Sequence, residues 1–205
     1  MKIYDCQQNT KEWLECKKLH FTASNASTIL ARGQGLKTLI HKLLTDYYSS
    51  GNYEEFTDSF TNKHLERGKE FEDKARKIYE LETGQEVKQV GFIESGEHVG
   101  CSPDGLVGDD GLVEFKCLSD KVYLEFVETG KISKPHYNQI QMQLWVTGRS
   151  WCDYFVVNFN FDPCYQSYRI YPDEQVFIEL NAAIKQATNT LLARKEILDK
   201  LLTKG

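Results

Sequence analysis

The chain has 205 residues, enough for one domain (residues 1–205) with a substantial core, and two domains would be cramped. Hydrophobic residues make up 40% of it and aromatic residues 12%, which excludes an intrinsically disordered protein. The formal net charge of −5 argues against a protein that coats nucleic acid without specificity, but not against a nucleic-acid enzyme whose carboxylates bind metal ions.

The cysteines and the first residues bear on the cell compartment. None of the six cysteines forms a CxxC pair, so we expect no structural zinc site and predict unbridged, mostly buried thiols in a reducing cytoplasm. The N-terminal stretch MKIYDCQQNT is too polar for a signal peptide, and no apolar run approaches the length of a membrane span. The sequence therefore predicts a cytoplasmic protein without membrane contact.

The N-terminal third has helical patterns. In the stretch TASNASTILARG, Thr22 or Ser24 is a candidate N-cap and Gly33 a candidate stop. A second helix is predicted over residues 36–47, where apolar residues recur at helical spacing. Residues 49–62 are typical of a loop between helices.

A third helix is predicted over residues 65–84. Phe71, Ala75 and Tyr79 lie on one apolar stripe of it, and Gly84 ends it. Glu72 lies at the border of this stripe, so we expect its carboxylate to face the edge of a sheet.

The middle and the C-terminal part predict a sheet. Short, partly alternating runs separated by glycines indicate five strands, at residues 85–94, 98–107, 111–118, 153–161 and 165–171. Residues 135–148 fit both a strand and a helix, and we favour a helix; residues 173–202 predict a long closing helix. The expected fold is α/β or α+β, a mixed sheet of about five strands with one inserted helix.

The segment CSPDGLVGDDGLVEFKC, residues 101–117, concentrates charged residues. On a strand, Glu114 and Lys116 share one face, and the opposite, core-facing side carries Val113, Phe115 and Cys117. The turn at residues 108–111 reverses the chain and brings Asp104 close to Glu114.

Two readings of this hairpin follow from its residues alone. Charges on a strand face are most often solvated surface charges. Two adjacent carboxylates, however, repel each other unless a cation lies between them, and oxygen ligands favour Mg²⁺ or Mn²⁺. Lys116 beside such a site could position or deprotonate a water, or balance the charge of a phosphate.

Four motifs carry a resemblance to a known family. Pro103-Asp104 followed by Glu114-Phe115-Lys116 matches the PD-(D/E)xK nuclease signature. The segments WLECKKLHFTAS, RGKEFE, CSPDGL…GLVEFKC and QIQMQLWVTG, in this order, resemble the phage lambda exonuclease family over residues 13–160. The resemblance implies a restriction-endonuclease-like core with a central mixed five-stranded sheet flanked by helices.

The resemblance also implies an activity. Members digest one strand of double-stranded DNA from the 5′ end, release mononucleotides and leave a 3′ overhang for phage-type recombination. It implies two Mg²⁺ ions per active site, with Mn²⁺ as a substitute, a homotrimer ring and a single-strand annealing protein as partner. The expected location is the cytoplasm of a bacterial host.

Metal ligands are carried over from the family residue by residue. Asp104 matches the aspartate shared by both metals, and Glu114 the second ligand, with the backbone carbonyl of Phe115 on the same ion. Glu72 matches the helix glutamate near the second metal.

Further site residues come from the same resemblance. Lys116 matches the lysine that activates the attacking water, and Gln139 a glutamine close to the active site. Ser24 and Ser102 match serines that bind the 5′-phosphate, and Lys17 takes the position of a family arginine. By themselves, Ser24 equally fits a plain N-cap and Gln139 a surface residue.

Two alternatives to the exonuclease remain. An endonuclease of the same fold would use the same residues and would cut closed circular DNA. A non-catalytic DNA-end adaptor would be under no demand to keep Asp104, Glu114 and Lys116 together.

Overall fold

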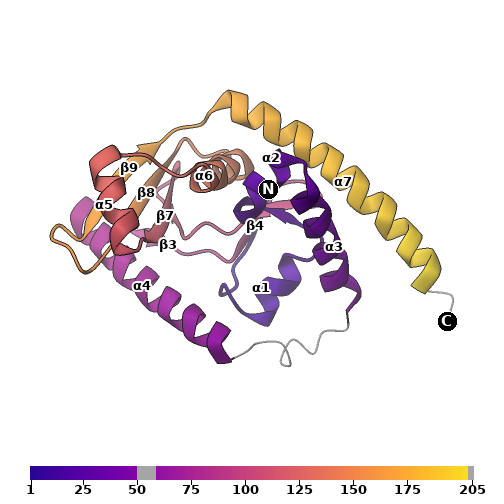
Figure 1. The fold of residues 1–205 in the computed structure, drawn as a ribbon, viewed down its shortest axis with the longest axis horizontal. Coiled ribbons are helices and arrows are strands. Elements are labelled where there is room, and N and C mark those ends of the chain that lie inside the picture. Colours follow the sequence, from indigo (N-terminus) through magenta and orange to yellow (C-terminus); the bar gives the residue numbers. More distant parts are fainter. Residues whose placement is uncertain (50–58, 203–205) are drawn as a thin grey trace.

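A computed structural model describes residues 1–49 and 59–202, with the side chains of residues 1–49 and 70–202 (Figure 1). The elements in chain order are β1 (Lys2–Tyr4), α1 (Lys11–Cys16), β2 (Phe21–Thr22), the 3₁₀ helix η1 (Ala23–Asn25), α2 (Ala26–Ala31), α3 (Gln34–Tyr48), α4 (Ser59–Thr83), β3 (Val87–Lys88), β4 (Phe92–Glu94), β5 (Val99–Cys101), β6 (Gly105–Val107), β7 (Gly111–Cys117), α5 (Asp120–Thr129), α6 (Lys134–Thr147), β8 (Trp151–Val157), β9 (Tyr165–Ile170) and α7 (Glu174–Leu202).

The larger sheet has five strands in the order β3-β6-β7-β8-β9. The β7–β8 pair is parallel and the other pairs are antiparallel, so the sheet is mixed, as predicted. Helices α4 and α7 lie on opposite sides of the molecule, and α6 lies between the sheet and α7 (Figure 1).

A second sheet, in the order β1-β4-β5-β2, is absent from the sequence-based expectation. The predicted strands 85–94 and 98–107 are each two short strands, one in either sheet. The first run breaks at Gly91, where an added Cβ would lie 2.9 Å from the Tyr4 carbonyl oxygen and closer still to Cys6. The second run breaks at residues 102–104, which therefore cross from one sheet to the other.

Both faces of the larger sheet are covered. The main apolar cluster includes Leu112, Ile140 and Leu180. It is formed by one face of the sheet together with the helices α2, α3, α6 and α7. The other face packs on α4 through a smaller cluster formed by Ala75, Tyr79, Val87, Val107, Val113, Phe115, Phe155 and Val157. The predicted core position of Cys117 is wrong, because this last residue of β7 is exposed.

The region between β7 and β8 holds two helices where one was predicted. The predicted helix is α6, which is capped by Ser133, has proline in its first turn and ends at Gly148. The unpredicted helix is α5, which begins after Ser119, ends at Gly130 in the left-handed conformation and buries an aromatic pair, Tyr123 and Phe126.

The N-terminal helices differ in detail from the prediction. Ser24 lies inside the 3₁₀ helix η1, and Asn25 takes the N-cap position of the six-residue α2. That helix has Arg32, in the left-handed conformation (φ 51°), as its C-cap. Gly33 is the N-cap residue of α3, so the prediction that Gly33 ends the first helix is wrong.

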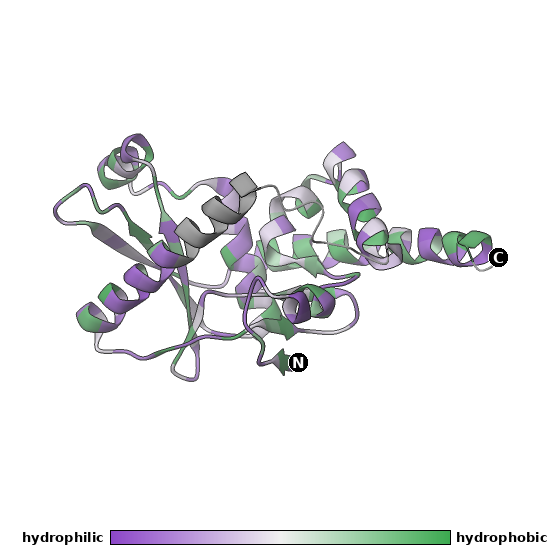
Figure 2. Ribbon diagram, turned by 90° about the horizontal axis from the view of Figure 1, so that it is seen from below, coloured by the Kyte–Doolittle hydropathy of each residue, from purple (hydrophilic) through white to green (hydrophobic). Residues whose placement is uncertain are grey.

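The predicted loop 49–62 is too long, because α4 already begins at Ser59; residues 50–58 lie outside the described residues. Helix α7 matches the predicted closing helix within one residue. Its C-terminal part extends beyond the rest of the chain (Figure 2) and exposes Ile197 and Leu201.

All six cysteines lie among the described residues, and none forms a disulfide there. Only Cys101 and Cys152 are buried, so the prediction of mostly buried thiols is wrong. In residues 1–49 and 59–202, no helix combines the length and the apolar character that crossing a membrane requires.

We expect Gly100→Ala to destabilise the fold. An added Cβ at this position in β5 would lie 2.7 Å from the Ile93 carbonyl oxygen and closer to the Phe92 ring, inside the smaller sheet. The free energy of unfolding, measured by urea denaturation, should fall by about 1–3 kcal/mol.

The control is Gly35→Ala, in the first turn of α3. There the nearest atom is a Thr28 methyl carbon at 3.4 Å, and alanine is favoured over glycine in a helix by about 0.5–1 kcal/mol. Equal stability of the two variants would contradict the close packing of the smaller sheet.

Candidate active site

The β6–β7 hairpin brings two predicted carboxylates together. The strands pair with Gly105 opposite Val113, so Asp104 lies beside the middle of β7. Its Oδ2 accepts a hydrogen bond of 2.7 Å from the backbone N–H of Phe115. This contact holds the Asp104 carboxylate next to Glu114, as the turn predicted.

The Glu114 side chain is 1% exposed, although it lies on a strand face predicted to be functional. Its Oε1 accepts a 2.7 Å hydrogen bond from Gln139 Nε2 and forms an ion pair with Lys116 Nζ. Its Oε2 accepts a 2.7 Å hydrogen bond from Gln143 Nε2. Three donors therefore contact this carboxylate. A buried charge requires such partners, because it has lost its hydration.

Gln143 was not predicted as a site residue. It is completely buried on α6, one turn after Gln139, so both amides reach the same carboxylate from one helix face. The repeated glutamines in QIQMQ at helical spacing were the signal that could have identified it.

The predicted acidic residues repel one another, and this repulsion contributes to their pKa values. Burial, and then the neighbouring Glu114, raise the pKa of Asp104 well above its usual range. Burial, followed by Glu114 and Asp73, also raises the pKa of Glu72 on α4, which places this glutamate within the field of the hairpin. Burial by itself lowers the pKa of Lys116, but Glu114 and Asp104 outweigh burial, so this pKa lies above its ordinary value.

The donor set suits a hard divalent cation. Carboxylate oxygens that repel one another are offered by Asp104, Glu114 and Glu72. The backbone carbonyl of Phe115 lies next to Glu114 on β7. Over the described residues, no three His, Cys, Asp or Glu side chains are grouped as a ready metal cage. Mg²⁺ does not require such a cage, since it commonly binds one or two carboxylates together with water and phosphate oxygens.

A histidine and a tyrosine also face Lys116, and sequence reasoning assigned neither to the site. His136 Nδ1 and the Tyr154 hydroxyl are 2.7 Å apart. Burial, then the Lys116 ammonium, lower the pKa of His136, which favours its neutral form. Burial raises the pKa of Tyr154 to about 12. Both side chains therefore act as neutral hydrogen-bonding groups beside Lys116.

The predicted phosphate-binding residues Lys17, Ser24 and Ser102 come from the N-terminal region and from the segment before Asp104. Lys17 and Ser24 line one cavity of about 230 Å³ between η1, α1 and α3. Lys17 Nζ lies 3.5 Å from the centre of the Trp13 ring, and Trp13 Nε1 donates a 2.9 Å hydrogen bond to Ser102 Oγ. Trp13, which was not predicted, thereby connects Lys17 with the segment that carries Asp104.

Ser24 does not occupy the helix N-terminus that was expected. Its hydroxyl lies 3.1 Å from the Thr22 hydroxyl within η1, and Asn25 is the residue at the start of α2. Burial and then the nearby Lys42 lower the pKa of Lys17 to about 8.

Comparisons with known proteins identify the family and the fold of the chain. The family model of a YqaJ-like viral recombinase domain matches residues 12–150. The crystal structure of an alkaline exonuclease from Laribacter hongkongensis is similar with a TM-score of 0.84 at 30% identity, over 95% of this chain and 99% of that chain. The same enzyme in complex with dAMP gives a TM-score of 0.83 at 31% identity, with the same coverage.

A phage-related exonuclease from Haemophilus somnus shares the fold, with a TM-score of 0.57 at 15% identity over 89% of this chain and 99% of that chain. No curated protein matches the sequence. The likeness to the Laribacter enzyme confirms the predicted fold class, a PD-(D/E)xK nuclease core with a mixed sheet flanked by helices.

We expect Asp104→Asn to stabilise the metal-free protein at neutral pH. Because its pKa is higher in the folded state than in the unfolded state, ionised Asp104 destabilises the fold at every pH above the folded value. The penalty disappears as the pH falls below about 4, where unfolded aspartate is protonated too. Asparagine keeps an oxygen for the Phe115 N–H and removes the charge.

The measurement is thermal unfolding in EDTA at pH 8 and at pH 3. The variant should be more stable by about 0.5–2 kcal/mol at pH 8 and equal to the parent at pH 3. Asp109→Asn, in the exposed turn of the same hairpin, serves as control and should change nothing at either pH. A loss of stability in Asp104→Asn at pH 8 would refute the charge repulsion.

Proposed function

The chain belongs to the family of YqaJ-like viral recombinase domains and is a homologue of an alkaline exonuclease, and we propose that it is a Mg²⁺-dependent 5′→3′ exonuclease of double-stranded DNA. Its membership confirms the resemblance to the lambda exonuclease family. In the proposed reaction one strand is digested to mononucleotides, and a 3′ single-stranded overhang remains for annealing.

One observation carries the proposal. Asp104, Glu114 and Lys116 converge within a single hairpin, and Glu114 is held by donors from α6. An adaptor would have no use for a carboxylate buried beside a second carboxylate and a lysine, because that arrangement costs stability. The family and the hairpin together favour hydrolysis of phosphodiesters.

We propose that Asp104, Glu114 and the Phe115 carbonyl hold one Mg²⁺ and that Asp104 and Glu72 hold a second. When bound, such ions stabilise negative charge on a scissile phosphate and lower the pKa of a bound water. Mn²⁺, with the same preference for oxygen ligands, is the expected substitute.

The chain's own residues then have distinct tasks. Lys116, whose raised pKa favours the ammonium form, orients the attacking water or neutralises a phosphate oxygen rather than acting as a base. Gln139 and Gln143 are positioning residues, since they hold Glu114 and do not point at the substrate by themselves. Water adds its oxygen to phosphorus, the P–O3′ bond breaks, and the 3′ oxygen leaves with a proton.

The products of this cut suggest a role for the cavity lined by Lys17 and Ser24. The released nucleotide carries its own 5′-phosphate and a new 3′-hydroxyl, and the shortened strand begins with a new 5′-phosphate. Lys17, Ser24 and Ser102 are proposed to bind that phosphate. Lysine offers a point charge where an arginine would grip with a planar fork, so the dependence on a 5′-phosphate should be weaker than with arginine.

We also propose the assembly that the family resemblance implies. A homotrimer ring would enclose the DNA, and a single-strand annealing protein would receive the overhang. The exposed apolar side chains Val122, Leu124 and Val127 on α5 and Ile197, Leu201 and Leu202 on α7 support contacts with other protein chains.

The proposal predicts the fate of labelled DNA. Linear duplexes labelled at either the 5′ or the 3′ end should lose one strand from the 5′ end, in Mg²⁺ but not in EDTA, while closed circles stay intact. Lys116→Ala should lower the rate by about 10²- to 10³-fold, because it removes a charge that acts on the transition state. Lys88→Ala, an exposed lysine on β3, is the matched control and should behave as the parent chain.

The other candidate functions give different results in the same assay. Cleavage of closed circles would indicate an endonuclease with the same site. Binding of linear DNA without any cleavage would overturn the nuclease and favour the DNA-end adaptor.

A second prediction concerns the 5′-phosphate. Since the Lys17 ammonium loses its proton as the pH rises through about 8, its attraction for phosphate is present below that pH and is lost above it. The ratio of digestion rates for 5′-phosphorylated and 5′-hydroxyl ends should therefore fall by about tenfold between pH 7 and pH 9.5.

Lys17→Met should show a low ratio at both pH values, and the exposed Lys37→Met on α3 should keep the full pH effect. A ratio that does not depend on pH in the parent chain would remove Lys17 from the phosphate site.

A further inference from the structure

Helix α6 contacts both parts of the proposed site. On one of its faces Gln139 holds Glu114 of the catalytic hairpin. Another face packs against η1 and α2. Ser24 of η1 lines, together with Lys17, the cavity of about 230 Å³ that we call the phosphate cavity. Successive side chains on a helix point about 100° apart, so Asn138, directly before Gln139, belongs to the face that meets η1 and α2.

Asn138 is a buried amide at this contact. It is 3% exposed, and its Nδ2 donates a 2.9 Å hydrogen bond to the Ser27 hydroxyl of α2. Its Oδ1 is buried and has no hydrogen-bond partner among the described residues. A buried amide with an unsatisfied oxygen is less favourable than an apolar side chain of the same shape. Packing of α6 against α2 therefore does not by itself explain this residue, whereas a requirement for one fixed position of α2 does.

The proposed reaction requires a fixed distance between two phosphates of the cut strand. When Lys17 and Ser24 bind the 5′-phosphate, the metal site must meet the next phosphate along the strand, or no mononucleotide is released. A misplacement of about 1 Å can lower the rate of a catalysed step by about 10²-fold. The phosphate cavity and the catalytic hairpin come from different parts of the chain, so contacts between those parts set this distance.

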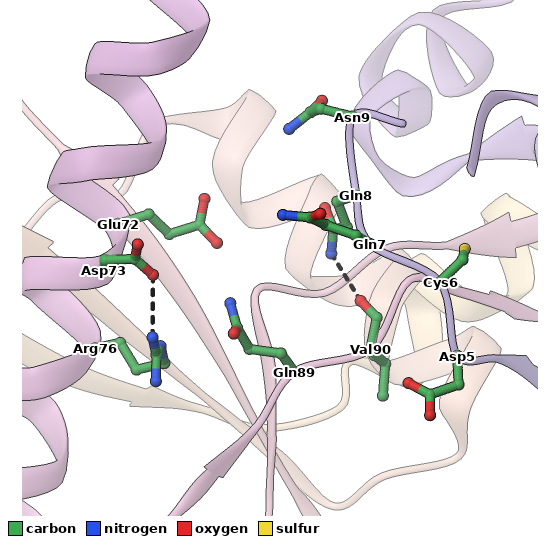
Figure 3. A pocket seen from close by; sticks show the side chains of 10 residues that line it. All are labelled: Asp5, Cys6, Gln7, Gln8, Asn9, Glu72, Asp73, Arg76, Gln89 and Val90. Atoms are coloured by element: carbon green, nitrogen blue, oxygen red, sulfur yellow. Dashed lines mark hydrogen bonds and ion pairs between the residues drawn. The ribbon is translucent and has the colours of Figure 1, made fainter. Parts of the chain in front are cut away.

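Hydrogen bonds fix the α1 side of the phosphate cavity relative to the catalytic segment. Trp13 on α1 donates to the Ser102 hydroxyl. Gln8 Nε2 donates 3.0 Å hydrogen bonds to the carbonyl oxygens of Val90 and Pro103. Figure 3 shows the contact of Gln8 with Val90 in the wall of a polar cavity of about 570 Å³, which lies between the segment before α1 and helix α4. This side of the phosphate cavity therefore has several ties.

The η1 and α2 side has a single tie of this kind. Among the described residues, the bond from Asn138 to Ser27 is the one side-chain hydrogen bond that joins η1 or α2 to α6. The other contacts between these helices are apolar, through residues such as Ala26 and Ile140. Apolar contacts are not directional, so they fix the position of one helix along another less strictly than a hydrogen bond does.

We propose that Asn138 is a positioning residue that sets the spacing between the phosphate cavity and the metal site, through its hydrogen bond to Ser27. The inference rests on the proposed function and adds to it the contact that keeps the two phosphate positions one nucleotide apart. Ser27 lies three residues after Ser24, so a fixed Ser27 also fixes Ser24 relative to α6. Gln139 fixes Glu114 relative to the same helix.

The test compares linear duplexes that carry a 5′-phosphate or a 5′-hydroxyl, digested in Mg²⁺ at pH 7. For each end kcat and KM are measured, and the products are separated by length. Asn138→Ala should lower the ratio of kcat/KM for phosphate over hydroxyl ends by about three- to tenfold, the effect of one hydrogen bond. The loss should lie in kcat for phosphorylated ends, because their 5′-phosphate still binds while the next phosphate is misplaced. Dinucleotides should appear among the products.

Variants of the partner keep the test independent of the fold of Asn138→Ala. Ser27 is half-buried, and Ser27→Ala should give the same change. The double variant should be no worse than either single one, since all three lose the same hydrogen bond. Ser27→Thr keeps the hydroxyl and should retain the parental ratio. Thr28→Ala, at the next position of α2, is the matched control, and melting midpoints verify that each variant is folded.

Three results would overturn the spacing role. The first is a parental ratio and parental product lengths in both single variants. The second is an equal loss of rate for both kinds of end, which would mean that the bond only stabilises the fold. The third is a double variant whose loss is the sum of the single losses.

Failure of the proposed function gives a different result. A parent chain that never digests linear DNA in Mg²⁺ refutes the nuclease. A parent chain that digests both kinds of end equally refutes the phosphate cavity, and the spacing role with it. Digestion that favours phosphorylated ends in the parent and in every variant alike refutes the spacing role alone.

Discussion

A carboxylate buried in the middle of a sheet is the constraint on which the other features depend. Glu114 is 1% exposed, with a neighbouring strand on each side of β7. Burying a charge without partners costs several kcal/mol, so three donors have to reach it. Lys116 comes from the same strand, and Gln139 and Gln143 come from α6. Helix α6 must therefore cross this face of the sheet with polar side chains turned inward, although a buried helix is ordinarily apolar.

The segment at residues 102–104 has a second structural role, because it joins the two sheets. Strand β5 belongs to the smaller sheet and β6 to the larger one. Asp104 begins the larger sheet and accepts the Phe115 N–H, while Ser102 is tied to Trp13. Gln8 in addition binds the Pro103 carbonyl, so two side chains from the N-terminal region hold this segment.

The two cavities differ in the charge of their lining residues. The smaller cavity is lined by Lys17 and Lys42, and burial followed by the charge of Lys42 lowers the pKa of Lys17 to about 8. Acidic and amide groups line the larger one. Asp104 and Glu72 have pKa values that are raised by burial and by Glu114. This accumulation of negative charge destabilises the protein alone and favours a bound cation, as is common where function opposes stability.

Patterns within short stretches of sequence determined most of the helices and the hairpin that joins Asp104 to Glu114, because the contacts involved lie within about a dozen residues. The helical spacing of Gln139 and Gln143 is also a pattern within a short stretch, although the sequence analysis named only Gln139 as a site residue. Tertiary structure alone decided how the short strands divide between two sheets, since β1 pairs with β4 through Lys2 and Glu94, far apart in the chain. It also decided that Trp13 reaches Ser102, 89 residues away, and that residues 5–9 meet α4 around a cavity. Contacts between such distant segments depend on how the elements pack, and they leave no periodic signal in the sequence.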